Sequence, residues 1–309
     1  MVDLVMIGEI TLDDTVLESG DVQRGQPGGG TVYAALGAVV WGRSVGINAV
    51  VGHEYPDENL RRLTDYGINV TGVVRYSGTS LRLWLLHEED DRKQQVPHLS
   101  SASFAELDQA RGPLPQAYLT ARGFHLAPAT PDGQHAALRE IRGQRDDVVV
   151  TLDMLTAPYI PTGPYSEGAV LRGLTAFLPS RAEVEALWGN IPLTTLIPEL
   201  ARCYDLPVLA VKLAAHGSLV YDSYAQQLYH IPIFRTETRD PTGAGDAYCG
   251  GFLGGLVETG SALEAGVRGT VSASFAVEYM GALPPDLPVP AEIQRRRNRV
   301  AAGIVSVNR

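Results

Sequence analysis

The stretch Asp240-Pro241-Thr242-Gly243-Ala244-Gly245-Asp246 leads directly into a segment rich in small residues, 247–258. The proline cannot continue a strand, and the two glycines allow unusual backbone angles and the close approach of a ligand. A helix that begins here directs several free backbone N–H groups, and the positive end of its dipole, at one spot. The stretch therefore predicts a binding site for an anion at the start of a helix.

Asp246 falls in the first turn of this predicted helix, so a carboxylate stands beside the anion site. Transfer of a phosphoryl group to an alcohol needs both features at one place, because charge must be held while the hydroxyl loses its proton. The alternative is a glycine-rich helix start with an acidic cap, since glycine-rich turns are common. Taken alone, the stretch leaves both interpretations open.

Other nucleotide-binding and metalloprotease motifs are missing. The sequence contains no Gly-Lys dipeptide, which excludes a P-loop, and no His-Glu-x-x-His. Gly28-Gly29-Gly30 lacks the spacing of a dinucleotide-binding fingerprint and does not directly follow the first predicted strand. The seven histidines are scattered along the chain, and we interpret each as structural.

Apolar, β-branched runs alternate with segments of helical pattern along most of the chain. This order is typical of βαβ units and predicts a mostly parallel sheet with helices on both faces. The predicted strands are Val2–Ile7, Val45–Val51, Ala121–Leu126, Val148–Leu152, Ala176–Leu178 and Val208–Leu213, followed by an antiparallel hairpin of Ser218–Tyr221 and Gln227–Ile233. The predicted helices are Thr31–Trp41, Asp57–Tyr66, Asp132–Arg142, Arg181–Trp188, Leu193–Tyr204, Ala244–Glu258 and Ala262–Tyr279.

Two stretches depart from this alternation, at about residues 11–26 and 72–99. Within the second stretch, Thr79–Leu99 reads as a hairpin with Leu81, Leu83 and Leu85 on one face. The charged segment 87–93 between its strands is interpreted as a solvated turn rather than a metal site. We expect these strands to form a small lid inserted in a single domain, 1–309. The leucine row needs cover from the core, the substrate or another subunit, and the last would give a homodimer through the lid.

Composition limits the partners of this chain. Its 309 residues include 25 basic and 35 acidic side chains, a net charge of −10 that disfavours nucleic acid and anionic membrane surfaces. No apolar stretch of 18 residues and no basic leader region occur, so we expect a cytoplasmic protein without membrane spans. Two cysteines cannot form a disulfide framework. The basic run 295–299 is interpreted as the solvated face of a final helix.

Asp240–Leu253 closely resembles the C-terminal signature of the ribokinase-like (PfkB) family of carbohydrate kinases. Further segments resemble this family in order and spacing, so the resemblance extends over nearly the whole chain. They are the first strand and its aspartate (8–13), the di-glycine signature (28–35), the Asn-x-x-Glu position (177–183), the nucleotide-binding turn (211–217) and Gly281-Ala282. The resemblance implies an α/β fold, a three-layer α/β/α sandwich with a mostly parallel central sheet and a small β lid.

The resemblance also implies roles for the residues around the anion site and the acceptor. Asp246 would take the proton from the substrate hydroxyl. Gly243, Ala244 and Gly245 would donate backbone N–H groups to the transferring phosphoryl group. Substrate hydroxyls would be bound by Asp13, Gly28 and Gly29, with Asp14 as the neighbouring alternative to Asp13.

On the nucleotide side, the resemblance implies an ATP site and a magnesium site. Lys212, Ala214 and Gly217 would line the nucleotide, and Thr270 would lie on the adenine side. Glu183 would order Mg²⁺ through water. ATP and Mg²⁺ are therefore the implied cofactors.

Three positions depart from the family pattern. Tyr33 stands where the family has a sugar-contacting Asn, which indicates a differently shaped or partly apolar substrate rather than ribose or fructose. The alternative is that Tyr33 packs within an apolar helix. Ser180 replaces the Asn of Asn-x-x-Glu and leaves Glu183 as its one charged member, and Ala214 replaces the usual glycine of the nucleotide turn.

The implied activity is ATP- and Mg²⁺-dependent transfer of the γ-phosphoryl group to an alcohol of a small sugar, polyol or related compound. One alternative is a nucleoside kinase, which an aromatic lid pocket with Trp84 and Tyr33 would favour. The other is a catalytically silent member that binds a sugar or nucleotide as a sensor. The intact Asp246 and its glycine turn argue against the silent member, because a pure binder does not need the base.

Overall fold

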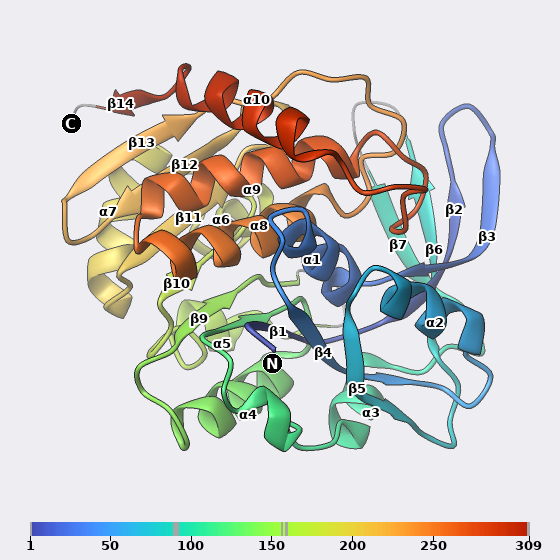
Figure 1. The fold of residues 1–309 in the computed structure, drawn as a ribbon. Coiled ribbons are helices and arrows are strands. Elements are labelled where there is room, and N and C mark those ends of the chain that lie inside the picture. Colours follow the sequence, from blue (N-terminus) through green and yellow to red (C-terminus); the bar gives the residue numbers. More distant parts are fainter. Residues whose placement is uncertain (1, 89–92, 156, 158–159, 308–309) are drawn as a thin grey trace.

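Two β-sheets organise the structure, a computed structural model that describes residues 2–88, 93–155, 157 and 160–307 (Figure 1). Within these residues, the larger sheet consists of β1 (Leu4–Ile7), β4 (Val45–Val51), β5 (Asn69–Arg75), β8 (Gly123–Leu126), β9 (Val149–Leu152), β10 (Ala176–Phe177), β11 (Val208–Lys212), β12 (Ser218–Asp222), β13 (Gln227–Ile231) and β14 (Val305–Val307). The smaller sheet consists of β2 (Thr11–Val16), β3 (Val22–Gly28), β6 (Leu81–His87) and β7 (Lys93–Pro97).

The larger sheet is mostly parallel. Its strands lie in the order β14-β13-β12-β11-β10-β9-β8-β1-β4-β5. Every neighbouring pair from β5 to β11 is parallel. β12, β13 and β14 are added in antiparallel orientation at one edge. Both the predicted parallel sheet and the predicted hairpin after β11 are therefore confirmed.

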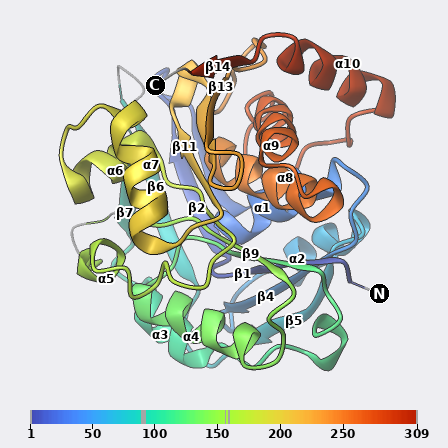
Figure 2. The ribbon, with the colours of Figure 1, turned by 90° about the vertical axis from the view of Figure 1, so that its left-hand side faces the viewer.

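Helices cover both faces of this sheet, which confirms the predicted three-layer arrangement. The helices are α1 (Gly30–Val39), α2 (Asp57–Asp65), α3 (Phe104–Ala110), α4 (Pro131–Arg142), α5 (Gly163–Ser166), α6 (Arg181–Trp188), α7 (Leu193–Tyr204), α8 (Ala244–Thr259), α9 (Ala262–Ala276) and α10 (Pro290–Ala301). Figure 2 shows α1, α8 and α9 on one side of the strands and α6 and α7 on the other. On β1, Leu4 and Met6 pack into one core cluster and Val5 and Ile7 into another, because successive side chains of a strand point to opposite faces.

Small residues let α8 pack closely against its neighbours α1 and α9. A Cβ on Gly250 would overlap the carbonyl oxygen of Ala34 in α1, and one on Gly269 of α9 would lie 2.8 Å from the carbonyl oxygen of Tyr248. The backbones are thus too close for larger side chains. This packing brings the first turn of α8 beside the Gly28–Gly30 segment at the start of α1.

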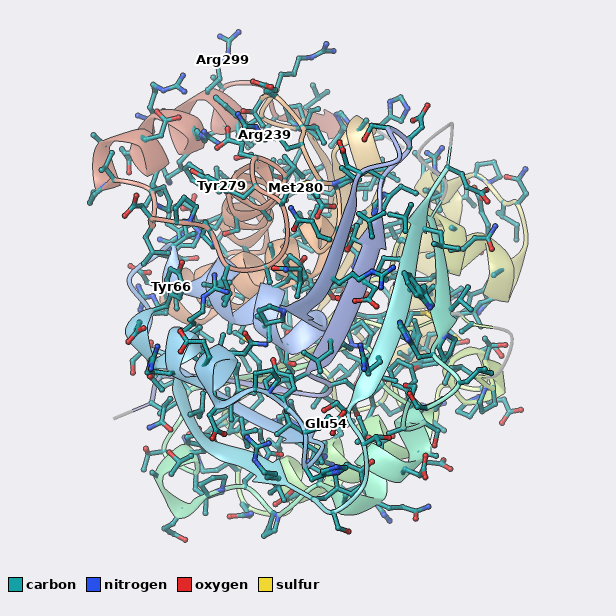
Figure 3. All side chains as sticks on the ribbon, turned by 90° about the vertical axis from the view of Figure 1, so that its right-hand side faces the viewer. Glu54, Tyr66, Arg239, Tyr279, Met280 and Arg299 are labelled. Atoms are coloured by element: carbon teal, nitrogen blue, oxygen red, sulfur yellow. The ribbon has the colours of Figure 1, made fainter. Side chains whose placement is uncertain are left out.

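The smaller sheet is the predicted lid, and it stands beside the larger sheet (Figure 3). Leu81, Leu83 and Leu85 are buried in one apolar cluster with Phe104 and Leu107 of α3, so the core of the same chain covers the leucine row. Glu54, labelled in Figure 3, binds the lid at its base, because its carboxylate accepts a hydrogen bond from the Ser80 N–H at 2.9 Å.

Part of the predicted lid boundary is wrong. Residues 72–75 belong to β5, which pairs with β4 in the larger sheet, and the second lid segment begins at Leu81. The apolar residues of 69–75 suit either sheet, and the buried neighbours on β4 decide between them. The sequence interprets the charged segment 87–93 as a solvated turn; His87 instead ends β6, and residues 89–92 lie outside the described residues.

The interpretation of the basic run as a solvated face also needs a correction. α10 is the predicted final helix, but Arg296 is buried between the rings of Phe234 and Phe275 and pairs with Glu278 and Glu292. Its guanidinium can be buried because these carboxylates compensate its charge and the rings cover its faces.

In the part of the chain that the structure describes, no helix combines the length and the apolar character needed to cross a bilayer.

Candidate active site

The first turn of α8 forms an open anion site. Gly243 precedes the helix with a left-handed backbone (φ 74°), and no side chain caps the helix start. The turn is held by the buried carboxylate of Asp240, which accepts hydrogen bonds from the N–H groups of Thr242 at 2.8 Å and Gly281 at 3.1 Å. The Ala244 N–H donates a hydrogen bond to the carbonyl oxygen of Pro241 at 3.3 Å, and the positive end of the α8 dipole lies at this turn, where an anion would bind.

Two carboxylates flank the Gly28-Gly29-Gly30 segment next to this turn. A Cβ on Gly28 would overlap Oδ2 of Asp13, and one on Gly30 would lie 2.9 Å from Oδ1 of Asp246. The glycines thus leave room for the carboxylates of Asp13 and Asp246 beside this segment. We call the space next to these two carboxylates the seat. Gly29 itself has φ 95°, a conformation that favours glycine.

The structure separates Asp13 from its neighbour Asp14. Asp13 lines the cavity at the start of α8. Asp14 points to the other face of the lid, where it accepts a hydrogen bond from the Gly25 N–H at 2.6 Å and lies 3.3 Å from Nε2 of His98. The alternation of side chains along β2 produces this separation.

These groups share one cavity of about 250 Å³. Predicted site residues that line it are Asp13, Gly29, Tyr33, Glu183, Lys212, Gly243, Gly245 and Asp246. Its other lining residues are Glu9, Thr11, Gly30, Leu83, Leu85, Gln95, Phe104, Pro128, Asp153, Met154, Leu155, Pro241 and Thr242. The cavity therefore joins the lid, the glycine segment and the anion turn.

Tyr33 is held between the core and the cavity. Its side chain is only 5% exposed and belongs to the core cluster around α1, and its ring lies against Gly243. Burial raises the pKa of the Tyr33 phenol well above its usual value, and the charges of Asp13, Asp240 and Asp246 raise it further. The hydroxyl therefore stays protonated and can act as a hydrogen-bond donor.

Lys212, at the end of β11, carries the positive charge of the cavity and forms a buried ion pair with Asp153. The Lys212 ammonium also lies 3.7 Å from Sγ of Cys249, and a Cβ on Gly245 would lie 3.4 Å from Nζ. Burial raises the pKa of the Asp153 carboxyl, while the lysine opposes that shift. The charge of Asp153 raises the pKa of Lys212, so the ammonium stays charged beside the anion turn.

Sequence reasoning missed Asp153 and Glu9. Asp153 directly follows β9, and the carboxyl ends of parallel strands are where α/β proteins bind ligands, so its position was a usable signal. Glu9 follows β1 in the same way. Burial raises the pKa of the Glu9 carboxyl well above its usual range, and the nearby Asp108 raises it further.

Glu183 caps helix α6 and also lines the cavity. It forms a capping box with Ser180: Oε2 of Glu183 accepts a hydrogen bond from the Ser180 N–H at 2.6 Å, and the Ser180 hydroxyl accepts one from the Glu183 N–H at 3.3 Å. The serine that replaces the family's Asn therefore caps α6. Glu183 also influences the pKa values of Asp153 and Lys212 electrostatically, which places its carboxylate near their ion pair.

The predicted nucleotide residues lie in two places. Ala214 and Gly217 bound the turn between β11 and β12, next to Lys212 but outside the cavity lining. Ala214 has φ 50°, a left-handed conformation that costs a residue with a Cβ about 1 kcal/mol. Thr270 is buried within α9, at 5% exposure, and does not line this cavity, nor does Ala244.

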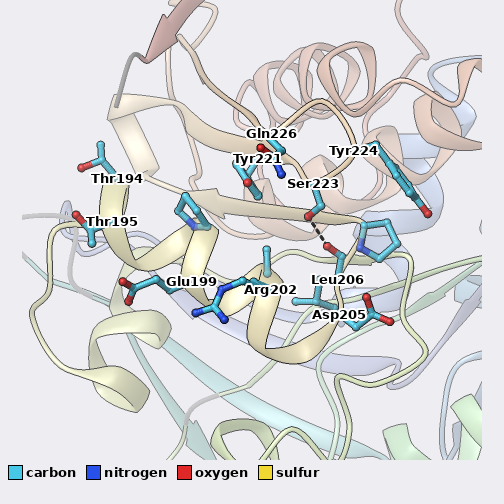
Figure 4. A pocket seen from close by; sticks show the side chains of 13 residues that line it. Thr194, Thr195, Glu199, Arg202, Asp205, Leu206, Tyr221, Ser223, Tyr224 and Gln226 are labelled. Carbon is cyan, nitrogen blue, oxygen red and sulfur yellow. Dashed lines mark hydrogen bonds between the residues drawn. The ribbon is translucent and has the colours of Figure 1, made fainter.

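A larger cavity, of about 860 Å³, lies elsewhere, between α7 and the turn from β12 to β13 (Figure 4). Its charged lining residues are Glu199, Arg202 and Asp205. Two of its lining residues are joined by a hydrogen bond from the Ser223 hydroxyl to the carbonyl oxygen of Leu206, at 2.6 Å (Figure 4). None of the residues around the anion turn lines it, so its volume does not make it the candidate active site.

Comparisons with known proteins identify the family of this chain. Residues 1–289 match the family described as pfkB family carbohydrate kinase. The chain is 30% identical over 279 residues to a cytidine kinase of Thermococcus kodakarensis, covering 87% of this chain and 93% of that protein. It is 33% identical over 112 residues to a 2-dehydro-3-deoxygluconokinase of Escherichia coli, covering 35% of each chain.

The fold is also that of solved relatives. A putative ribokinase II from E. coli in complex with ATP and Mg²⁺ superimposes with a TM-score of 0.74 at 18% identity, covering 97% of this chain and 100% of that one. At this identity the likeness concerns the fold, and the family match over residues 1–289 carries the assignment. The chain belongs to the pfkB family of carbohydrate kinases and is a kinase of the sugar and nucleoside class.

Proposed function

We propose that this protein transfers the γ-phosphoryl group of ATP to a hydroxyl of a nucleoside, with Asp246 as the general base. The observation that carries the proposal is the position of Asp246, in the first turn of α8, beside Gly30 and in one cavity with Asp13. The base, the anion turn and a second carboxylate for the acceptor thus meet at one seat. Phosphoryl transfer to an alcohol uses this combination.

The reaction follows from the placement of these groups. The acceptor hydroxyl, positioned by Asp13, attacks the γ-phosphorus while Asp246 takes its proton, and the bond from that phosphorus to the leaving ADP oxygen breaks. The N–H groups at the start of α8 and the Lys212 ammonium stabilise the charge on the transferring group. Asp153 orients that ammonium through their buried ion pair. Ala214 and Gly217 would contact the nucleotide from the neighbouring turn, and we place Thr270 on its adenine side.

The residues around Lys212 also fit a magnesium ion bound with the nucleotide. Mg²⁺ sites of this kind use one or two carboxylates together with substrate phosphates and waters. Glu183 and Asp153, which both line the cavity, supply that number. The ion would neutralise phosphate charge. The related ribokinase II with ATP and Mg²⁺ supports the same choice of cofactors.

A nucleoside is favoured by the long match to a cytidine kinase and by the apolar walls of the cavity. The expected aromatic lid pocket is present only in part, because Tyr33 lines the cavity while Trp84 stacks on His98 outside its lining. Leu83 and Leu85 of the lid and Phe104 of α3 line the cavity, and Leu83 is the register partner of Asp13 on the neighbouring strand. A flat base suits such walls, while ribose hydroxyls suit Asp13 and Asp246. The second candidate is an uncharged sugar or polyol, because both carboxylates accept hydrogen bonds from hydroxyl groups in either case.

The test is ADP formation with cytidine, other nucleosides, myo-inositol, ribose and fructose as acceptors. We expect turnover with a nucleoside and loss of about 10²–10⁴-fold in kcat for Asp246→Asn, with nucleotide affinity retained. Asp132→Asn is the matched control, since Asp132 also lies in the first turn of a helix but is exposed on α4. Near-normal turnover of Asp246→Asn removes it from the mechanism, and nucleotide binding without turnover of any acceptor identifies a silent sensor.

A further inference from the structure

Carboxylates surround the acceptor end of the cavity. Asp13 and Asp246 face the seat from the two ends of the Gly28–Gly30 segment, whose missing side chains make room for them. The main-chain carbonyl of Glu9 lies against Gly29 and accepts a hydrogen bond from the Thr31 hydroxyl. This side of the cavity therefore presents oxygen atoms that accept hydrogen bonds, and these suit a substrate whose hydroxyl groups donate them.

Negative charge around Tyr33 marks the acceptor end of the cavity. Its phenol is 5% exposed, and the charges of Asp13, Asp240 and Asp246 all raise its pKa beyond the effect of burial. Three carboxylates, one from β2, one from the segment before α8 and one from α8, therefore act on the Tyr33 phenol beside the seat. The phenol remains a donor and adds no positive charge.

The described lining of the cavity contains one cation, Lys212. Lys212 is bound to Asp153 and lies near Gly245, where the phosphoryl group would be held. Glu183 adds a further carboxylate near this pair. The Lys212 charge is therefore compensated by Asp153, and the described lining contains no second cation that could pair with an acidic acceptor.

We propose that this cavity selects acceptors without negative charge and rejects those that carry a carboxylate. The inference rests on the proposed function and deepens it by separating two classes of relatives. A nucleoside, sugar or polyol places hydroxyl donors against Asp13 and Asp246. A sugar acid such as 2-dehydro-3-deoxygluconate, the compound in the name of one relative, brings a carboxylate into the same field. The carboxylate has no cation there, and like charges in a partly desolvated site repel strongly.

The experiment compares two acceptors of the same shape that differ in charge. 5-Carbamoyluridine carries a neutral amide where 5-carboxyuridine carries a carboxylate, so steric effects cancel. We expect kcat/KM to be about 10- to 100-fold higher for the amide, the penalty of a buried charge without a partner. Gluconamide and gluconate form the equivalent pair if the acceptor is a polyol. A ratio within twofold in the active pair overturns the inference.

Gln95 allows the charge of the seat to be changed without disturbing the fold. It is exposed on lid strand β7 and lines the cavity. Gln95→Lys should lower the preference for the neutral acceptor severalfold, and Gln95→Glu should increase it. Gln94→Lys is the matched control, because Gln94 points to the other face of β7, where it bonds to Glu88 at 2.6 Å. Equal effects of the two lysine variants would contradict a local charge effect at the seat.

Binding measurements can test the charge selectivity even if the proposed kinase activity is wrong. If no acceptor of either charge is phosphorylated, the proposed kinase activity fails. The shift in Tm of the unmodified protein with each acceptor of a pair, in the presence of a non-hydrolysable ATP analogue, then decides the inference. A larger shift with the neutral partner supports it, and equal shifts or a larger shift with the carboxylate overturn it.

Discussion

The ring of Tyr33 lies directly against the backbone of Gly243, so that a Cβ at position 243 would overlap Cδ1 of the ring. Tyr33 comes from α1 and Gly243 precedes α8, and the close packing of these helices brings the two residues together. The sequence left open whether Tyr33 packs in the core or contacts substrate. The ring packs under the anion turn, and the same residue lines the cavity.

We expect Gly243→Ala to lower both stability and nucleotide affinity. The new methyl group must displace the ring or the turn, and φ 74° adds about 1 kcal/mol of backbone strain. Gly245→Ala is the comparison, because its Cβ would meet no atom closer than Lys212 Nζ at 3.4 Å. Urea unfolding and nucleotide titration should show the larger loss for Gly243→Ala, and equal losses would argue against the contact with Tyr33.

The buried pair of Asp153 and Lys212 should matter for both stability and catalysis. Asp153→Asn leaves a buried ammonium without its counter-charge, which costs about 3–5 kcal/mol in the free energy of unfolding. Because the ammonium then loses its orientation, we expect kcat to fall about 10- to 100-fold.

An exposed pair provides the control for this change. Asp147 pairs with Arg145 at 2.7 Å at the surface, where solvent screens the charges, so Asp147→Asn should leave both the free energy of unfolding and kcat nearly unchanged. Urea unfolding and steady-state kinetics measure the two effects. An Asp153→Asn enzyme that unfolds and turns over like Asp147→Asn would show that the ion pair is dispensable.

His87 connects the lid to the anion turn. Its Nε2 lies 3.0 Å from the Thr242 hydroxyl and 3.9 Å from Oδ1 of Asp240. His87→Ala removes this contact, so the lid should open more often and the acceptor KM should rise about tenfold, with a smaller change in the ATP KM.

The second lid histidine is the control for His87. His98 stacks on Trp84 at 4.7 Å and faces Asp14 rather than the anion turn. His98→Ala should therefore leave both KM values close to those of the unmodified protein. If acceptor and ATP KM rise together in His87→Ala, the lid does not act on the acceptor selectively.

His125 makes the protein sensitive to acid. It is fully buried on β8, with Nδ1 2.9 Å from the Thr151 hydroxyl, and burial lowers its pKa to about 3. An unfolded histidine has a pKa of about 6.5, so the unfolded chain binds more protons between these values. The contribution of His125 to stability is complete above about pH 6.5 and is lost as the pH falls towards 3, up to roughly 5 kcal/mol.

We expect His125→Gln to flatten the decrease in unfolding free energy between about pH 6.5 and pH 4. His53→Gln, at an exposed histidine, should leave that slope unchanged. Chemical unfolding at a series of pH values measures both slopes. Parallel slopes for His125→Gln and the unmodified protein would mean that another group causes the acid sensitivity.

Local pattern predicted the parallel sheet, the helix starting at Ala244 and several of the residues that line the cavity. These features depend on hydrophobic period, on turn-forming glycines and on one dense motif, all of which are written along a short piece of chain. Boundaries were less accurate where a segment suits two environments. Residues 72–75 read as lid but pair with β4, because the edge of the larger sheet offers them a buried partner.

The sequence by itself determined the fold class and the chemistry of the turn, because Gly243, Gly245 and Asp246 lie within four consecutive residues. Tertiary structure alone decided which distant groups join them. The pairing of Asp153 with Lys212, the choice of Asp13 over Asp14 and the packing of Tyr33 against Gly243 all connect separate elements. Such contacts depend on which face a strand turns to the cavity and on how closely two helices approach. Both result from packing the whole core, and no short stretch of chain encodes them.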